Sequence, residues 1–86
     1  MSKSVLHLDL HPIAKQGKAI DEALLDIIEQ AHNRKAKIVE IIPGKGTGQL
    51  KKRVRKFLDR KDIKARYDRV QVDANNHGRI FVYFSH

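Results

Sequence analysis

Two residues near the start of the chain, Asp9 and His11, have the types and the spacing of an acid–base pair. Leucines alternate there with polar residues, which predicts a half-buried strand over residues 5–10. Side chains two apart on a strand share a face, with Cα atoms about 6.5–7 Å apart. An aspartate in that position can orient the histidine ring for general acid–base catalysis. The competing interpretation is an exposed and solvated strand face.

The same strand also carries His7, so that the row reads His-x-Asp-x-His. Three such groups on one strand face could chelate a metal ion. Two histidines on an exposed strand are more often bystanders, however, and we assign no metal ligands here. Further along, Phe81 and Tyr83 share a face of a predicted strand, where exposed aromatic rings could stack on nucleic-acid bases. Core filling is the favoured interpretation of these rings.

A glycine-rich turn is the second feature that could do chemistry. Glycines allow backbone N–H groups to converge on an anion, and a lysine among them adds a positive charge. The spacing matches neither a Walker A motif nor a dinucleotide-binding fingerprint. We therefore expect either contact with a phosphate group or a plain strand-to-helix turn with a threonine near the helix N-terminus. The turn consists of Gly44, Lys45, Gly46, Thr47 and Gly48.

The net charge of +8 is concentrated directly behind this turn. Ten Lys and Arg residues fall within positions 45–66 against Asp59 and Asp62, whereas positions 1–44 carry six basic and six acidic groups. A local field of this kind attracts polyanions. We expect the nucleic-acid-binding residues on a helix here to be Lys51, Lys52, Arg53, Arg55 and Lys56.

Length and composition bound the remaining possibilities. Eighty-six residues make one small domain, 1–86, and a hydrophobic content of 41% is sufficient for a folded core. The chain has no cysteine and no apolar run long enough to span a membrane. Its N-terminus lacks the apolar region of a secretion signal. Nothing indicates export, so we expect a cytoplasmic protein, and no hydrophobic seam demands a dimer, so we expect a monomer.

The elements that must position these residues follow from hydrophobic periodicity. Helical spacing of apolar residues predicts two amphipathic helices, and the nearly continuous apolar run before the glycine turn predicts an interior strand. The order βαβαββ gives an α/β two-layer sandwich with both helices on one face, a parallel first βαβ unit and a final hairpin. The expected ranges are 5–10, 18–33, 37–42, 49–60, about 67–72 and 80–84.

Two motifs in combination resemble the Smr (small MutS-related) domain, whose hallmarks are an L-D-x-H strand and an H-G-x-G or T-G-x-G turn that opens a helix. Here they read Leu8-Asp9-Leu10-His11 and Pro43-Gly44-Lys45-Gly46-Thr47-Gly48. Gly78, before the last predicted strand, resembles a third feature of the family. The resemblance covers nearly the whole chain, and its spacing is more specific than either motif alone.

This resemblance implies a mixed four-stranded sheet and a role in nucleic-acid binding, with nicking of DNA or cleavage of RNA in several members. It implies contexts at stalled ribosomes or in DNA repair. The family's acidic and imidazole positions map to Asp9 and His11, and its phosphate-facing loop includes Lys45. The chain departs from the pattern at Pro43, where the family often has His, and at Pro12, where it usually has Gly.

The leading hypothesis is therefore an endonuclease in which Asp9, His11 and Lys45 are catalytic. On RNA the nucleophile could be the neighbouring 2′-hydroxyl, so that cleavage is a transesterification. On DNA it must be water, with a divalent metal such as Mg²⁺ or Mn²⁺ as an open alternative and no certain cofactor. The second hypothesis, motivated by Pro43, is a module that recognises DNA or RNA structure without cleaving it. The third hypothesis is an adaptor that binds a membrane surface through the apolar residues of the basic helix. The core needs the same apolar residues, which counts against this hypothesis.

Overall fold

The computed structural model describes residues 5–13, 15–43, 48–73 and 78–85. The elements within these ranges follow the expected βαβαββ order, with two short helical turns in addition. In chain order they are β1 (Val5–Asp9), the 3-10 turn η1 (His11–Ile13), α1 (Gly17–Arg34), β2 (Ile38–Ile42), α2 (Gln49–Leu58), α3 (Lys61–Lys64), β3 (Arg69–Asp73) and β4 (Arg79–Tyr83).

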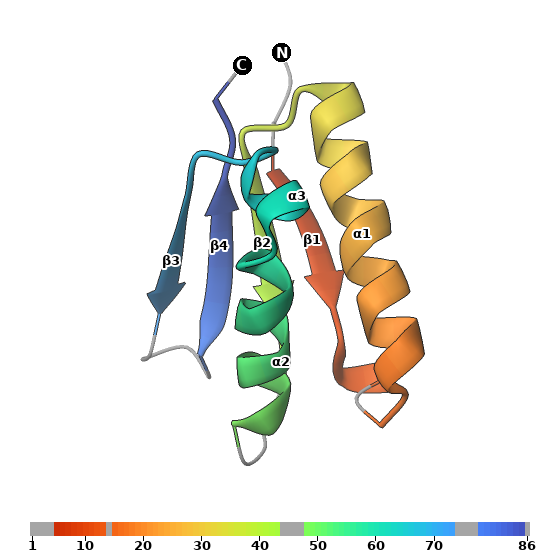
Figure 1. Ribbon diagram of the computed structural model, residues 1–86. Helices are drawn as coiled ribbons and strands as arrows, with labels where there is room; N and C mark the ends of the chain where they lie inside the picture. The colour runs from red at the N-terminus through yellow and green to blue at the C-terminus, as the bar shows by residue number, and fades with distance from the viewer. Residues whose placement is uncertain (1–4, 14, 44–47, 74–77, 86) are drawn as a thin grey trace.

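The strands form one mixed sheet in the order β1-β2-β4-β3 (Figure 1). β1 runs parallel to β2, with Val5 opposite Ile38 and Asp9 opposite Ile42. β4 pairs antiparallel with both β2 and β3. Both the parallel first unit and the closing hairpin are confirmed. The carboxyl ends of β1 and β2 consequently lie at the same end of the sheet as the first turn of α2 (Figure 1).

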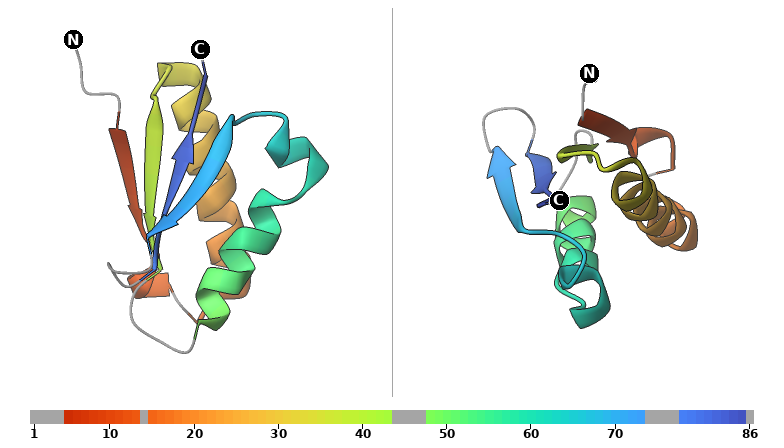
Figure 2. Two further views of the ribbon diagram at one scale, coloured as in Figure 1. Left: turned by 90° about the vertical axis from the view of Figure 1, so that its left-hand side faces the viewer. Right: turned by 90° about the horizontal axis from the view of Figure 1, so that it is seen from above.

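Both long helices cover the same face of the sheet and leave the other face open (Figure 2). The core lies between these two layers and is built almost entirely from aliphatic side chains. Strand residues alternate between it and the open face, since Ile80 and Val82 are buried while Arg79, Phe81 and Tyr83 are half-buried on the other side. The largest fully buried side chains are Leu10, Ile20, Leu24, Ile28, Ile41, Leu58, Ile63, Ile80, Val39, Val54 and Val82.

The second helix is shorter than expected. The sequence predicts one helix to Arg60, but α2 ends at Leu58, and Arg60 has extended backbone angles (φ −63°, ψ 140°) before the single turn of α3. Ile63 explains the break, because it lies five residues beyond Leu58 and a straight helix would turn it away from the core. After the break Ile63 is fully buried.

Two strand assignments also change at their ends. β1 stops at Asp9, and His11 begins the 3-10 turn, so His11 does not continue the strand row as expected. Tyr67, expected in the third strand, precedes β3 and donates a hydrogen bond from its hydroxyl to the backbone oxygen of Leu58 (2.7 Å). Burial, followed by the charge of Asp59, raises the pKa of Tyr67. Phe84 fills the core as expected, 7% exposed.

Candidate nucleic-acid interface and acid–base site

Asp9 and His11 lie together at the carboxyl end of β1, and both are exposed. The contact between them differs from the one that their spacing predicts. Asp9 Oδ1 accepts a hydrogen bond from the backbone N–H of His11 at 2.9 Å. This is an Asx-type turn, in which a short carboxylate satisfies an N–H two residues on. Asp9 therefore shapes the 3-10 turn that carries His11, and this bond leaves the imidazole ring unconstrained.

The glycine turn connects the end of β2 to the start of α2. Four of its residues that we expect at a phosphate, Gly44, Lys45, Gly46 and Thr47, lie outside the described residues. The fifth, Gly48, stands at the N-cap of α2 with a φ of 91°, a left-handed conformation that favours glycine. The backbone N–H groups of the first turn of α2 are thus presented at the same end of the molecule as Asp9 and His11 (Figure 1).

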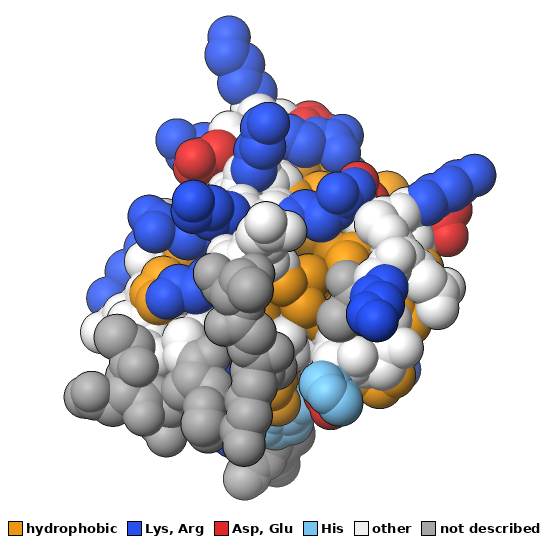
Figure 3. Space-filling model, turned by 90° about the horizontal axis from the view of Figure 1, so that it is seen from below, with side chains coloured by type: hydrophobic (Ala, Val, Ile, Leu, Met, Phe, Trp, Pro, Cys, Tyr) orange, Lys and Arg blue, Asp and Glu red, His pale blue; other side chains and the backbone are white. Residues whose placement is uncertain are grey.

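The basic side chains of α2 follow the expected pattern, outward from an apolar stripe. Val54, Phe57 and Leu58 are buried, whereas Lys52, Arg55 and Lys56 are exposed. Seen from below, Lys and Arg side chains gather on the side of the molecule that carries the helices (Figure 3). A surface of this kind neutralises backbone phosphates without reading bases.

Two of the basic residues make defined contacts. Arg53 donates two hydrogen bonds to the carboxylate of Asp21 on α1, at 3.2 and 3.1 Å. An open groove beside this pair is lined by Asp21, Arg53, Lys56, Phe57 and Arg60. The half-buried Lys51 lies against Gly78 at the start of β4: a Cβ added to Gly78 would come within 3.0 Å of Lys51 Cδ. Gly78 also has a positive φ of 71°.

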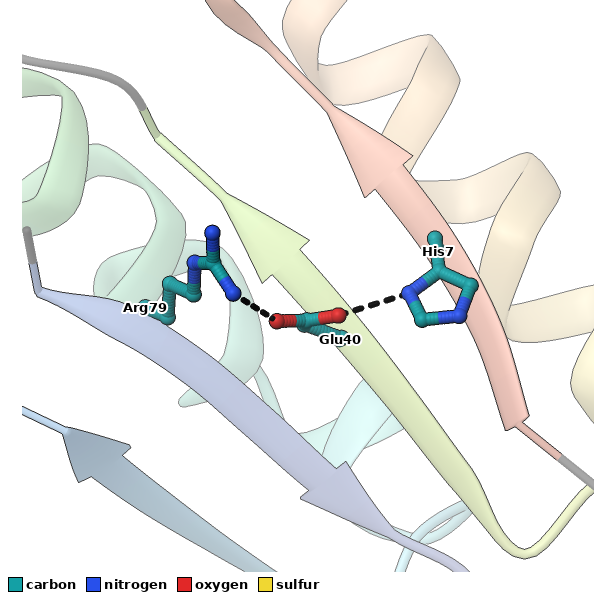
Figure 4. A network of polar contacts seen from close by, with 3 residues as sticks. All are labelled: His7, Glu40 and Arg79. Atoms are coloured by element: carbon teal, nitrogen blue, oxygen red, sulfur yellow. Dashed lines mark hydrogen bonds and ion pairs between the residues drawn. The ribbon is translucent and has the colours of Figure 1, made fainter. Parts of the chain in front are cut away.

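A polar network that the sequence analysis missed lies on the open face of the sheet (Figure 4). Glu40, from the middle of β2, is the one buried charged residue among those described. Its Oε1 lies 2.6 Å from His7 Nδ1 and its Oε2 lies 2.9 Å from Arg79 Nη1. The signal in the sequence is a single glutamate inside an otherwise apolar strand, but its partners depend on strand register: His7 is the residue opposite Glu40 in β1.

These contacts divide the His-x-Asp-x-His row. His7 is held by Glu40, Asp9 accepts the His11 N–H, and His11 stands on the 3-10 turn. Within the described ranges no group of three or more His, Asp or Glu side chains is arranged to hold a metal ion. In the same part of the chain, no helix is long and apolar enough to cross a membrane.

The open face also carries the two aromatic residues of β4. Phe81 and Tyr83 lie half-buried there, so the favoured interpretation that both fill the core is wrong for this pair. The guanidinium of Arg69 lies 4.3 Å from the centre of the Tyr83 ring, a cation–π distance. Tyr83 also donates a hydrogen bond to Gln71 at 3.3 Å.

Comparison with known proteins supports the sequence motifs. A family model described as the Smr domain matches residues 8–85, which is nearly the whole chain. Neither curated proteins nor solved structures gave a match. The matched range begins at Leu8, one residue before the end of β1, and includes α1, α2, α3 and the final hairpin.

Proposed function

The chain belongs to the Smr domain family, and from that premise we propose that it is an endonuclease that nicks DNA or cleaves RNA. The family is one of nucleic-acid-binding and endonuclease-type domains, which supports an interaction of this chain with nucleic acid. One observation carries the proposal of cleavage: an exposed acid and imidazole, Asp9 and His11, stand at the same end of the sheet as the N-terminus of a basic helix.

In this proposal the helix side of the molecule binds the polymer. Successive phosphates are neutralised by Lys52, Arg55 and Lys56, with Lys51 and Arg53 at the edges of this surface. The phosphate under attack is held by Lys45 and by the glycines of the turn, Gly44 to Gly48. The logarithm of the affinity for duplex DNA should therefore fall with the logarithm of salt concentration, with a slope of about −0.9 for each phosphate contact. Fluorescence anisotropy between low and moderate salt measures this slope, and a salt-independent affinity contradicts the surface.

His11 supplies the proton transfer, and Asp9 supports it by fixing the turn on which His11 stands. General acid–base catalysis by one positioned side chain contributes about 10²–10⁴-fold in rate. The Asp9→Ala and His11→Ala variants should lose this factor and retain binding, because neither residue belongs to the basic helix. His11→Ala is an exposed substitution, so thermal unfolding should change little. Asp9→Ala also removes the hydrogen bond from the His11 N–H and should cost about 1 kcal/mol of stability.

The first experiment incubates the purified domain with end-labelled structured RNA and supercoiled plasmid, with and without Mg²⁺ or Mn²⁺. The Asp9→Ala/His11→Ala double variant is the negative control, and His32→Ala on α1 is a matched histidine control. Cleavage by the wild type and by the His32→Ala variant, with loss in the double variant, supports the nuclease. Equal cleavage by the double variant contradicts the assigned roles.

A specific observation favours a second function, recognition of DNA or RNA structure without cleavage. Pro43, which is buried at the end of β2, stands where the family often has a histidine, and Pro12 lies in the 3-10 turn where the family usually has glycine. Proline removes a backbone donor at each position. Salt-dependent binding with no cleavage of either polymer would support this alternative, in a ribosomal or DNA-repair setting and as a monomer.

A further inference from the structure

The network on the open face contains a buried carboxylate whose presence requires an explanation. Glu40 occupies the central strand β2, where the apolar neighbours Ile41 and Val39 are fully buried. Its side chain is 11% exposed, and burying a carboxylate is costly unless both oxygens are paired. An apolar residue would satisfy the fold at this position. Glu40 therefore has its role through the two groups that it holds.

The first of these groups is the imidazole of His7. An ionised carboxylate can only accept hydrogen bonds, and Glu40 also accepts one from a guanidinium, so Nδ1 of His7 is the donor in the 2.6 Å contact. In the neutral ring the proton is then on Nδ1, and Nε2 has a free lone pair. The side chain of His7 is 61% exposed, and Nε2 lies on the side of the ring away from Glu40 (Figure 4). This is the arrangement of a positioned general base.

The second group is the guanidinium of Arg79. One terminal nitrogen binds Glu40 Oε2 at 2.9 Å, and the other points away from the carboxylate (Figure 4). The imidazole and the guanidinium are held on the two oxygens of one carboxylate, so both lie on the open face on either side of Glu40. A guanidinium with free N–H donors matches the oxygens of a phosphate.

This network is connected to the basic side of the molecule through Gly78, the residue before Arg79. A Cβ added to Gly78 would lie 3.1 Å from Lys51 Nζ, so the ammonium group in the first turn of α2 stands beside the start of β4. The start of β4 therefore lies next to the first turn of α2, where the proposed polymer-binding surface begins. Phe81 follows Arg79 on that face, and its half-buried ring offers a surface on which an unpaired base can stack.

We propose that His7, Glu40 and Arg79 form a second acid–base site, separate from Asp9 and His11, for cleavage of single-stranded RNA, a proposal that rests on the nuclease function above. His7 is the catalytic base, Arg79 binds a non-bridging phosphate oxygen, and Glu40 is a positioning residue that acts through both. RNA is the substrate class because it carries its own nucleophile, so a base and a cation on the open face are sufficient for the reaction.

The step balances as a transesterification. Nε2 of His7 takes the proton of the 2′-hydroxyl, the 2′ oxygen forms a bond to phosphorus, and the bond from phosphorus to the 5′ oxygen breaks. Water protonates the departing 5′ oxygen. The products are a 2′,3′-cyclic phosphate on one fragment and a 5′-hydroxyl on the other, and His7 returns its proton to solvent.

The test is single-turnover cleavage of an end-labelled, unstructured RNA by His7→Gln, Glu40→Gln and His32→Ala variants, with RNA affinity measured in parallel. Glutamine at position 7 can still donate an N–H to Glu40 and so preserves the fold while removing the base. We expect His7→Gln to lower the rate about 10²–10⁴-fold with affinity within twofold of wild type. Glu40→Gln should lower the single-turnover rate by a smaller factor and leave RNA affinity unchanged, and His32→Ala should match wild type.

Two further readouts separate a chemical role from a structural one. Imidazole added to a His7→Gly variant should restore part of the rate, and a 2′-deoxy nucleotide at the cleaved position should abolish cleavage. If His7→Gln cleaves at the wild-type rate while Asp9→Ala/His11→Ala does not, this inference is wrong and the proposed nuclease stands. If the wild type cleaves neither RNA nor DNA, this inference and the proposed nuclease are both wrong. Salt-dependent binding without cleavage would then support the recognition function.

Discussion

The helix side and the open side of the sheet handle charge in opposite ways. On the helix side, Lys52, Arg55 and Lys56 are exposed to water. The ion pairs Arg53–Asp21 and Arg60–Asp62 are themselves about half-exposed. Charges of this kind add little to stability but attract a polyanion from a distance. On the open side a single buried carboxylate, Glu40, holds two partners in fixed positions. In the functions that we propose, the helix side therefore binds the polymer and the open side positions reacting groups.

The largest effect is expected from removing positive charge on the helix side. Changing Lys52, Arg55 and Lys56 together to Gln removes three phosphate contacts, which should lower affinity for duplex DNA about 10²–10³-fold at 0.1 M salt and make the salt slope shallower by about 2.7. Stability should remain within about 0.5 kcal/mol of wild type because all three residues are exposed. Anisotropy titrations at several salt concentrations measure both quantities.

The matched control removes the same charge elsewhere. Arg34, Lys35 and Lys37 are exposed, lie between the end of α1 and the start of β2, and are outside the basic segment 45–66. That end of α1 is opposite the first turn of α2 (Figure 1). Joint replacement of these three residues by Gln should reduce affinity far less, and an equal loss from both triple variants would mean that only net charge matters and that the surface is not local.

The next largest effect is expected on stability, when the Glu40 network on the open side is changed. Arg79→Met removes one partner from a buried carboxylate, and unfolding in urea should show a loss of about 1–3 kcal/mol. Glu40→Met removes the buried charge itself, and its two former partners, 61% and 38% exposed, can turn to water. We expect Glu40→Met to lie within about 1 kcal/mol of wild type, since an apolar residue of similar size replaces a buried ion well. The reverse order would show that the carboxylate contributes to stability directly.

A smaller effect tests the contact between Gly78 and Lys51, which joins the two sides. Gly48 and Gly78 both have positive φ, so alanine at either should cost about 1 kcal/mol of stability. A Cβ at Gly48 meets nothing within 4 Å, whereas one at Gly78 presses on Lys51. Gly78→Ala should therefore also weaken RNA binding, and this loss should vanish in a Lys51→Gln background. A loss that persists there would place its cause outside the Lys51 contact.

The smallest expected effect concerns the stability of the helix side at acid pH. The hydrogen bond from Arg60 holds the pKa of Asp62 below its usual value. A lowered carboxyl pKa in the folded state stabilises the protein above the unfolded pKa, and this contribution is lost as pH falls through the folded pKa. Asp62→Asn should thus lower the midpoint of thermal unfolding slightly at pH 7 and leave it unchanged near pH 2. A larger change at acid pH would contradict the assignment.

Much of the fold was predictable because hydrophobic periodicity alone indicates whether each of these segments is a helix or a strand. The leucine alternation of β1, the helical spacing of α1 and the apolar run of β2 each indicate one structure. The break before α3 was not predictable in this way, because it depends on Ile63 reaching a core that other elements build. The spacing of Asp9 and His11 predicted a shared strand face, but their actual contact depends on where β1 stops.

The acid–base network was harder to anticipate for a related reason. Glu40 is 33 residues from His7 and 39 from Arg79, and only the register of β2 with β1 and β4 brings the three together. Sequence spacing describes neighbours along a strand, whereas this site runs across three strands. A lone charged residue in an interior strand is the signal that would have prompted a search for cross-strand partners.

The strand order β1-β2-β4-β3 has a consequence for how the chain acquires its fold. β4 is the last of the four described strands along the chain, yet it occupies an interior position between β2 and β3. Until β4 is synthesised, one edge of β2 lacks its partner strand, and so does β3. We therefore expect the sheet to be completed late, and a pause in translation before residue 79 should leave the nascent chain open to pairing with other strands.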